Sequence, residues 1–255
     1  MSFVVIIPAR LHSTRLPRKP LQLIHGQPMI YWTWRQAQKS GAQRIIIATE
    51  STEVAAVCRE FGAEVCLTSE QHQSGTERIA EVIALSLLAP EQIIVNLQGD
   101  EPLLPPQLIH QVAQGLEIHP DVPMATLCEP ITDCATLFDP NAVKVSRNAE
   151  QMALTFSRAP LPWARDEFAE RRDLLPKADL FRRHIGLYAY RAGFVTRYVA
   201  WPPCALEQLE KLEQLRVLWH GEKILVLDAL MEAGGGVDTL EDLERVRLAQ
   251  KPSEG

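Results

Sequence analysis

The apolar residues in the first half of the chain follow two alternating patterns. Short apolar runs rich in branched residues lie at residues 3–7, 44–48 and 93–97. Such runs are typical of strands that are buried on both faces of a parallel sheet. Between the runs, apolar residues recur every three or four positions, as on helices that cover a sheet. This alternation predicts right-handed crossovers and an α/β fold with a doubly wound, mostly parallel but mixed sheet.

Turn and capping residues mark the limits of the predicted helices. One helix starts after Pro28 and ends before Gly41, and Ser51 or Thr52 can cap the next. The other elements expected of the sheet domain are a strand at 63–67, a helix at 74–89, a strand at 223–227 and a helix at 239–249.

The pattern changes after residue 128. Five prolines and a charged run at residues 165–173 interrupt it, and strand-like segments remain at 142–146 and 185–190. We interpret residues 129–200 as a sub-lobe inserted into one domain that spans residues 1–255, with the charged run as an exposed loop.

Composition narrows the possible partners and compartment. The 255 residues are 46% hydrophobic and carry a net charge of −6, which argues against a nucleic-acid partner because such proteins present a basic surface. The five cysteines are scattered and include no C-x-x-C pair, so we expect reduced packing residues and no zinc site. Because neither a signal peptide nor an apolar run of transmembrane length is present, we expect a cytoplasmic protein without a membrane partner.

A cluster of cations follows the first predicted strand. Pro8 ends that strand, and the next residues include Arg10, Arg15, Arg18 and Lys19. In an open α/β sheet this position borders the ligand crevice, and guanidinium and ammonium groups complement phosphate oxygens. The chain has neither a Walker motif nor G-x-G-x-x-G, so this is not a common glycine-rich phosphate loop. The alternative is a solvated basic turn.

Several sequence blocks resemble one enzyme family. The segment Ile-Pro-Ala-Arg-Leu-His-Ser-Thr-Arg-Leu-Pro-Arg-Lys-Pro-Leu at residues 7–21 is similar to the opening motif of the 3-deoxy-manno-octulosonate (Kdo) cytidylyltransferases, also called CMP-Kdo synthetases. Further matching blocks lie at residues 72–78, 95–102, 156–163, 183–190, 209–216 and 236–239. The chain departs from the family pattern at Arg18, Glu77 and Leu240, where the family usually has Gly, Asp and Pro.

The resemblance implies a nucleotidyltransferase-type sheet and a specific reaction. It implies transfer of CMP from CTP to Kdo with release of pyrophosphate, for lipopolysaccharide biosynthesis. It also implies a homodimer, with residues 129–200 as a sugar-binding and dimerisation sub-lobe. Three alternatives stay open: a cytidylyltransferase for a related acidic sugar of the sialic acid or amino-Kdo type, a nucleotide-sugar glycosyltransferase, and a non-catalytic nucleotide sensor. A glycosyltransferase would normally have D-x-D where this chain has Gly-Asp-Glu-Pro at residues 99–102.

Two aspartates are candidate ligands of Mg²⁺. Asp100 follows a buried strand, and Asp238 follows a glycine run just before the last helix. Mg²⁺ takes oxygen ligands, usually one or two carboxylates completed by substrate oxygens and water. From the residues alone, an N-cap paired with Glu241 or Asp242 is the better interpretation of Asp238. The resemblance instead implies that Asp100 and Asp238 both bind the metal.

The resemblance also implies the nucleotide site. It assigns catalytic roles to Arg10, Arg15, Lys19 and Asp100. The expected nucleotide-binding residues are Pro8, Ala9, Arg10, Arg15, Lys19, Ser74, Gly75, Arg78 and Gln98. Arg78 and the amides of the helix that follows Ser74 would read the cytosine edge. A second interpretation of Ser74 is structural, because Glu77 three residues later completes a capping box.

The sugar side is expected on the blocks of the second half. The implied sugar-binding residues are Gln98, Arg158, His184, Gly186, Tyr188, Glu210 and Gln214. We expect one continuous helix at residues 205–219, with the leucines at positions 206, 209 and 212 turned inward. On that helix Glu210 and Gln214 share a face toward the crevice, whereas Glu207 and Glu213 are expected to be solvated.

Overall fold

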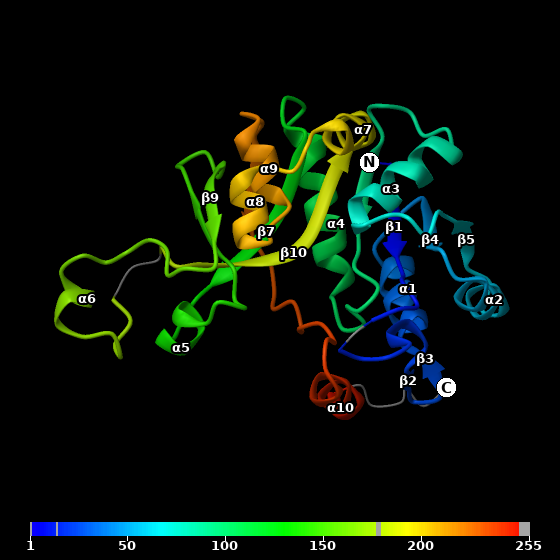
Figure 1. Cartoon of the computed structure of the whole chain (residues 1–255), viewed down its shortest axis with the longest axis horizontal. Helices are drawn as coiled ribbons and strands as arrows, with labels where there is room; N and C mark the ends of the chain where they lie inside the picture. The colour runs from blue at the N-terminus through cyan, green and yellow to red at the C-terminus, as the bar shows by residue number, and fades with distance from the viewer. Residues whose placement is uncertain (1, 14, 177–179, 250–255) are drawn as a thin grey trace.

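The computed structural model describes residues 2–13, 15–176 and 180–249 (Figure 1), so the last residues of the expected domain lie outside the described part. The strands are β1 (Phe3–Pro8), β2 (Leu23–Ile24), β3 (Gln27–Pro28), β4 (Arg44–Thr49), β5 (Glu64–Leu67), β6 (Ile93–Asn96), β7 (Met124–Pro130), β8 (Lys144–Arg147), β9 (Ala153–Ser157), β10 (Arg182–Arg191) and β11 (Ile224–Asp228). The helices are a 3₁₀ turn at Lys19–Leu21, α1 (Met29–Lys39), α2 (Thr52–Glu60), α3 (Gly75–Leu85), α4 (Pro106–Ile118), α5 (Cys134–Phe138), α6 (Glu167–Glu170), α7 (Ala192–Ala200), α8 (Ala205–Glu210), α9 (Gln214–Trp219) and α10 (Leu240–Ala249).

The expected mixed, mostly parallel sheet is confirmed. Its strands run in the order β11-β7-β10-β6-β1-β4-β5, and the β8–β9 hairpin pairs with β10. Strand β1 is parallel to β4 and β6, β4 is parallel to β5, and β11 is parallel to β7. Strand β10 is antiparallel to both of its neighbours, β6 and β7. The sheet is therefore two parallel parts joined by one antiparallel strand.

Both faces of β1 are buried, which explains its unbroken apolar sequence. Phe3, Val5 and Ile7 pack in a core with residues of α1, α2 and α4. Val4 and Ile6 pack in a second core with residues of α3, α7 and α9. Because successive side chains of a strand point to opposite faces, a strand covered on both sides needs apolar residues at every position.

The inserted lobe is smaller than the sequence indicated. Figure 1 shows α5 and α6 to one side of the sheet, with α6 farther from it, while the β8–β9 hairpin extends the sheet through β10. Strand β10 starts at the base of this lobe but continues between β6 and β7, and α7 packs on the second core. Residues 182–200, which we expected in the sub-lobe, therefore belong to the main sheet and its covering layer. Residues 160–176 are rich in prolines and charges, so the local pattern did not indicate that the next strand lies in the main sheet.

The helix expected at residues 205–219 is two helices. Lys211 adopts a left-handed conformation with φ of 55°, and its N–H bonds to the Glu207 carbonyl, which ends α8. Before the turn, Leu206 and Leu209 are 46% and 81% exposed, whereas Leu212, which follows it, is buried. The predicted inward leucine stripe is wrong for the first two positions.

The C-terminal helix α10 packs on the N-terminal hairpin. Leu243 and Val246 share a small apolar core with Leu16, Ile24 and Met29. Figure 1 shows α10 beside the β2–β3 hairpin, below the sheet. Helix α10 therefore packs against the segment that follows β1 and carries the basic loop. Among the described residues, no helix is both long and apolar enough to cross a membrane.

Candidate active site

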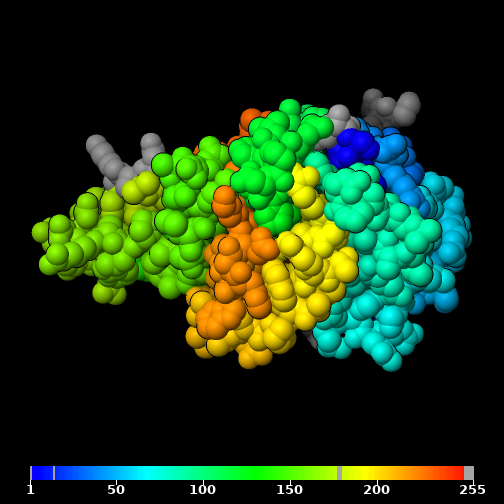
Figure 2. All heavy atoms as spheres, turned by 90° about the horizontal axis from the view of Figure 1, so that it is seen from above, coloured from blue at the N-terminus to red at the C-terminus, as the bar shows by residue number. Residues whose placement is uncertain are grey.

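A cleft of about 760 Å³ lies at the strand ends that the sequence indicated. Of the expected site residues, Gly75, Gln98, Asp100, His184, Gly186, Tyr188, Gln214 and Asp238 line it. Its walls come from the ends of β6 and β10, from α3 and α9, and from residues 233–238. In Figure 2, the lobe projects to one side of the segment from α7 to α9, and the N-terminal half lies on the other side.

Glycine lets the ends of β1 and β6 approach closely. A Cβ atom on Gly99 would lie 2.8 Å from the backbone oxygen of Pro8, which is shorter than ordinary contact. Any other residue would push the loop of Asp100 away from the loop that follows β1.

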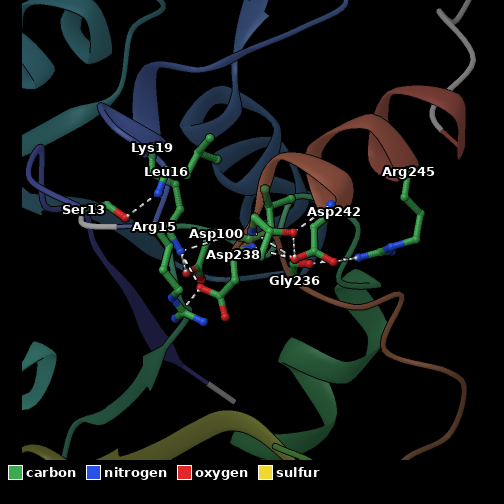
Figure 3. A network of polar contacts seen from close by, with 11 residues as sticks. Ser13, Arg15, Leu16, Lys19, Asp100, Gly236, Asp238, Asp242 and Arg245 are labelled. Atoms are coloured by element: carbon green, nitrogen blue, oxygen red, sulfur yellow. Dashed lines mark hydrogen bonds and ion pairs between the residues drawn. The ribbon is translucent and has the colours of Figure 1, made fainter.

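Four charged residues from distant parts of the sequence meet at this edge (Figure 3); we call Arg15, Lys19, Asp100 and Asp238 the charged edge. The ammonium of Lys19 donates to Asp100 Oδ2 at 2.6 Å and to Asp238 Oδ1 at 2.8 Å. It also donates to the backbone oxygen of Val237 at 3.0 Å, and Arg15 donates to Asp238 Oδ1 at 2.9 Å. Burial opposes the charge on Lys19, yet the two carboxylates outweigh it and raise the pKa of the ammonium.

The charged edge fits a hard divalent cation. Asp100 and Asp238 accept hydrogen bonds from the same nitrogen, so their oxygens are close enough to share one cation. Both donors are carboxylate oxygens, the ligands that Mg²⁺ prefers, and the adjoining cleft leaves room for phosphate oxygens and water to complete the shell. No cluster of three or more acidic, histidine or cysteine ligands occurs within the described ranges, so an all-protein cage is not present there.

Asp238 is not the helix cap that its sequence context favoured. The side chain of Thr239 accepts from the N–H of Asp242 at 3.2 Å, and Asp242 Oδ2 accepts from the N–H of Thr239 at 3.0 Å. Thr239 and Asp242 therefore form the reciprocal cap at the start of α10. The carboxylate of Asp238 instead faces Lys19 and Arg15.

A third carboxyl, Glu101, lies beside the charged edge. Burial, together with the neighbouring Asp100 and Asp238, raises its pKa to about 8. A Cβ atom on Gly236 would lie 2.8 Å from Glu101 Oε1, so a larger residue at position 236 would force the Glu101 carboxyl to move.

A buried ion pair between Glu50 and Arg78 supports the basic loop. Glu50 accepts from the N–H of Leu11 at 3.0 Å and forms an ion pair with Arg78 at 2.9 Å. Arg78 is 1% exposed and also donates to Thr68, so it supports the loop and does not line the cleft. A terminal nitrogen of Arg10 is buried without a hydrogen-bond partner among the described residues, and an anionic ligand could supply that partner.

The other expected nucleotide residues surround the start of α3. Ser74 caps this helix and forms the capping box with Glu77, so its structural interpretation is confirmed. Gly75 lies beside Pro8, and Ala9 is buried with its N–H bonded to the Ala48 carbonyl at 2.8 Å. The turn therefore places a helix N-terminus with free amides next to the end of β1.

The opposite side of the cleft is lined by uncharged polar rings; we call His184, Tyr188 and Tyr190 the buried floor. Burial lowers the pKa of His184 to about 3 and raises the pKa of both tyrosines. The rings of His184 and Tyr188 lie 5.3 Å apart, and those of Tyr188 and Tyr190 stack at 5.9 Å. Gln98 donates to Asn96 at 3.3 Å at the edge of this floor.

The neutral ring of His184 is oriented by Thr126. The Thr126 hydroxyl lies 2.9 Å from Nε2 of His184 and 2.8 Å from the Leu187 carbonyl. Because the carbonyl can only accept, the hydroxyl donates to it and accepts from Nε2–H of the histidine. This assigns the Nε2–H tautomer and leaves Nδ1 of His184 as an acceptor.

Arg158 and Glu210 lie together but outside the cleft lining. Glu210 accepts from the N–H of Arg158 at 2.8 Å and from the hydroxyl of Ser157 at 2.8 Å. The guanidinium of Arg158 donates to the carbonyls of Glu210 at 2.6 Å and Pro140 at 2.8 Å. These contacts join β9 of the lobe to α8, so both residues act here as a structural link and not as direct cleft contacts.

The helix break reverses the expected roles of the glutamates. Glu213 lines the cleft and accepts from the Thr76 hydroxyl at 2.9 Å, and burial raises its pKa. Glu207 is 8% exposed and pairs with Arg216. Glu207 is therefore not solvated as expected, whereas Glu213 is exposed, as expected, although its carboxyl lines the cleft. Glu210 and Gln214 do not share a helix face, because Lys211 separates α8 from α9.

Several cleft residues were not anticipated from the sequence. They are Thr76, Asn96, Glu101, Tyr190, Tyr198, Glu213 and Arg245. Asn96 could have been predicted from the sequence, because it is the one polar residue in the apolar run at residues 93–97. Arg245 could not have been predicted, because solvated arginines are common on surface helices.

Comparisons with known proteins agree with this geometry. A sequence model described as cytidylyltransferase matches residues 4–224. The protein named 3-deoxy-manno-octulosonate cytidylyltransferase 1 of Hydrogenovibrio crunogenus is 68% identical over 97% of this chain and 95% of its own length. The 3-deoxy-manno-octulosonate cytidylyltransferase of Pseudomonas fluorescens is 59% identical over 96% of this chain and 97% of its own length.

Solved structures extend the likeness to three dimensions. The chain superposes on a structure of CMP:2-keto-3-deoxy-manno-octonic acid synthetase complexed with CTP with a TM-score of 0.88, at 39% identity and over 98% of both chains. For 4-diphosphocytidyl-2C-methyl-D-erythritol synthase, with a TM-score of 0.63 and 14% identity over 97% of both chains, the likeness is one of fold alone. On the matched blocks, the coverage and the identity, this chain belongs to the 3-deoxy-manno-octulosonate cytidylyltransferase family.

Proposed function

We propose that this protein transfers CMP from CTP to Kdo and releases pyrophosphate, as a step that supplies activated sugar for lipopolysaccharide. The observation that carries the proposal is the meeting of Lys19 with Asp100 and Asp238 at the strand-end edge of a cleft. In the reaction, the anomeric hydroxyl oxygen of Kdo bonds to the α-phosphorus, the bond from that phosphorus to the pyrophosphate oxygen breaks, and the hydroxyl proton is lost.

The cations of the basic loop hold the triphosphate. Arg10 has a buried nitrogen free to donate, and Arg15 and Lys19 lie at the cleft edge with donors close to both aspartates. Fixed cations favour the transition state because negative charge gathers on the departing pyrophosphate. The turn at Ser74 and Gly75 places helix amides beside Pro8, where they can contact the nucleotide.

Asp100 and Asp238 would hold Mg²⁺ between them. When bound, the metal would neutralise phosphate charge and lower the pKa of the attacking hydroxyl. With the metal held by the two carboxylates, Lys19 would be available to donate to phosphate oxygens. A lysine ammonium is protonated near neutral pH, so Lys19 would bring a positive charge to that role.

The buried floor is the proposed sugar side. Gln98, Gln214 and Glu213 offer hydrogen-bonding groups to a polyol, and His184 offers a neutral acceptor at Nδ1. Gly186 leaves open space, since a Cβ there would meet no atom within 4 Å. Arg158 supports this side through its link to α8.

We also propose that the protein is a cytoplasmic homodimer. The lobe carries exposed apolar side chains, among them Leu154 at 61%, Trp163 at 48% and Leu180 at 66% exposure, and a second copy would cover them. Light scattering should give the mass of a dimer, and Leu154→Glu should shift the population toward monomer. A monomer in the unaltered protein would remove the dimer from the proposal.

One assay tests the reaction and its alternatives. The protein is mixed with Mg²⁺, CTP and one sugar, and pyrophosphate is measured with Kdo, 8-amino-Kdo or sialic acid as the sugar. Kdo should give the highest kcat/KM. Preference for another acidic sugar would keep the chemistry and change the substrate. No pyrophosphate release with any of them would refute the proposed function.

A further inference from the structure

The segment that carries Asp238 lacks regular structure. Gly234, Gly235 and Gly236 precede it, and the first two adopt left-handed conformations with φ of 80° and 73°. Glycine gives the backbone its largest conformational freedom, so a run of three does not hold a side chain in place by itself. The position of the Asp238 carboxylate beside Asp100 must therefore be fixed from outside the segment.

Arg245 of α10 supplies one fixed point. Its guanidinium donates to the Gly234 carbonyl at 3.1 Å and to the Gly236 carbonyl at 2.9 Å. Two of its nitrogens would lie 3.4 Å from a Cβ atom on Gly235, so the group packs directly over the middle glycine. The planar guanidinium thus binds the backbone at both ends of the glycine run.

Asp242 supplies a second fixed point on the same helix. Its Oδ2 accepts from the N–H of Asp238 at 3.1 Å, and its Oδ1 accepts from Arg245 at 3.3 Å. From the other side, the N–H of Val237 donates to the Asp100 carbonyl at 2.9 Å. The two proposed metal ligands are thereby joined through backbone contacts that end on α10, as the network in Figure 3 shows.

We propose that Arg245, together with Asp242, is a positioning residue that sets the Asp238 carboxylate beside Asp100 for cation binding. Arg245 lines the cleft, but its terminal nitrogens already donate to backbone carbonyls and to Asp242, so it acts through the backbone and not on the substrate. The inference rests on the proposed function, because it assigns this role toward the metal of that reaction.

The test measures metal binding separately from turnover. Mn²⁺ is titrated in the presence of CTP and followed by electron paramagnetic resonance, and the Mg²⁺ dependence of pyrophosphate release is recorded in parallel. Arg245→Lys keeps the charge but cannot bridge two carbonyls in the same way. We expect the affinity for Mn²⁺ to fall roughly ten- to a hundredfold, as for other groups that orient metal ligands. The Mg²⁺ concentration that gives half-maximal pyrophosphate release should rise by a similar factor.

Arg247→Lys is the matched control. Arg247 lies on the same helix and donates to the Leu23 carbonyl of the hairpin, so its loss should lower the melting temperature without changing metal affinity. Asp242→Asn provides a second variant if Arg245→Lys does not fold, and it should weaken Mn²⁺ binding in the same direction.

The outcomes separate the two proposals. If the unaltered protein releases pyrophosphate and binds Mn²⁺ but both variants bind it equally well, the positioning role is refuted and the proposed function stands. If the variants lose only CTP or Kdo saturation at full Mg²⁺, Arg245 is a substrate contact and the inference is again wrong. If the unaltered protein binds no Mn²⁺ with CTP present, the metal site fails, and the inference fails with it.

Discussion

The charged edge and the buried floor face the same cleft, but the first presents paired charges and the second presents uncharged polar groups. At the charged edge, Lys19 and Arg15 are ionised and satisfied by Asp100 and Asp238. On the buried floor, His184 and the tyrosines have no opposite charge to pair with, and burial holds them neutral. The comparison shows how one cleft can present fixed charge to a triphosphate and uncharged hydrogen-bonding groups to a sugar.

The difference also affects what each region needs from the rest of the fold. The charged edge gathers residues from distant parts of the chain, and its geometry depends on Gly99, which allows the backbone of Pro8 to approach closely. The buried floor is built mainly on β10, whose two neighbouring strands hold it in register. Substitutions at the edge should therefore change turnover, whereas substitutions on the floor should change sugar use and acid stability.

The largest effect is expected from Asp100→Asn. Removal of one charge-stabilising contact from a reacting centre typically lowers turnover by roughly a hundred- to a thousandfold. The variant should remain folded, because Lys19 keeps Asp238 as a partner. Steady-state pyrophosphate release and a thermal melt measure the two properties. Asp121→Asn, at an exposed ion pair with Lys223, is the control; near-normal turnover of Asp100→Asn would remove this residue from the catalytic site.

A smaller and selective effect is expected beside the floor, where two glutamates can be compared: Glu213 lines the cleft and Glu210 does not. Glu213→Gln removes a carboxyl group that faces the cleft, so the KM for Kdo should rise by about tenfold or more while CTP saturation stays the same. Glu210→Gln alters the link between the lobe and α8, so the free energy of unfolding should fall by about 1–3 kcal/mol with little change in KM.

The same pair can contradict the assignment of the floor. If Glu210→Gln raises the KM for Kdo and Glu213→Gln does not, the sugar lies closer to the lobe than the cleft geometry indicates. Kinetics with each substrate varied in turn and chemical unfolding of both variants decide between these results.

A pH effect should distinguish the floor from the edge. The folded pKa of His184 is about 3, whereas the unfolded value is near 6.5. Below pH 6.5 the unfolded chain therefore binds a proton that the folded chain does not, so stability falls as the pH falls from 6.5 toward 3. His184→Gln should lose less unfolding free energy over this window than the unaltered protein does. His119→Gln is the control. If the unfolding free energy falls equally with pH in the unaltered protein and in both variants, His184 is not a buried neutral group.

The smallest effect is expected at Arg18. This residue has φ of 54°, a left-handed conformation that glycine adopts without strain. Arg18→Gly relieves that strain but adds flexibility to the unfolded chain and removes the exposed ion pair with Glu53, so the opposing effects should nearly cancel. We expect a change in unfolding free energy of less than about 1 kcal/mol. A large loss of turnover would show that Arg18 contacts the nucleotide.

Local sequence determined the sheet and the charged edge. The unbroken apolar run of β1 indicated burial on both faces, and the cations after Pro8 and the acid at position 100 follow strands whose ends must meet at one edge. Parallel pairing forces that meeting, so the convergence of Lys19 and Asp100 could be anticipated without coordinates.

Only the tertiary structure decided the floor and the position of β10. The break between α8 and α9 depends on a left-handed lysine at position 211, where no glycine marks a helix end. That single turn moves Glu213 into the cleft and Glu210 out of it. Likewise, β10 follows a proline-rich, charged stretch, yet it enters the centre of the sheet because β6 and β7 leave hydrogen-bonding edges that it alone fills among the described strands. Local propensity cannot specify such pairings, because they are made between residues far apart in the chain.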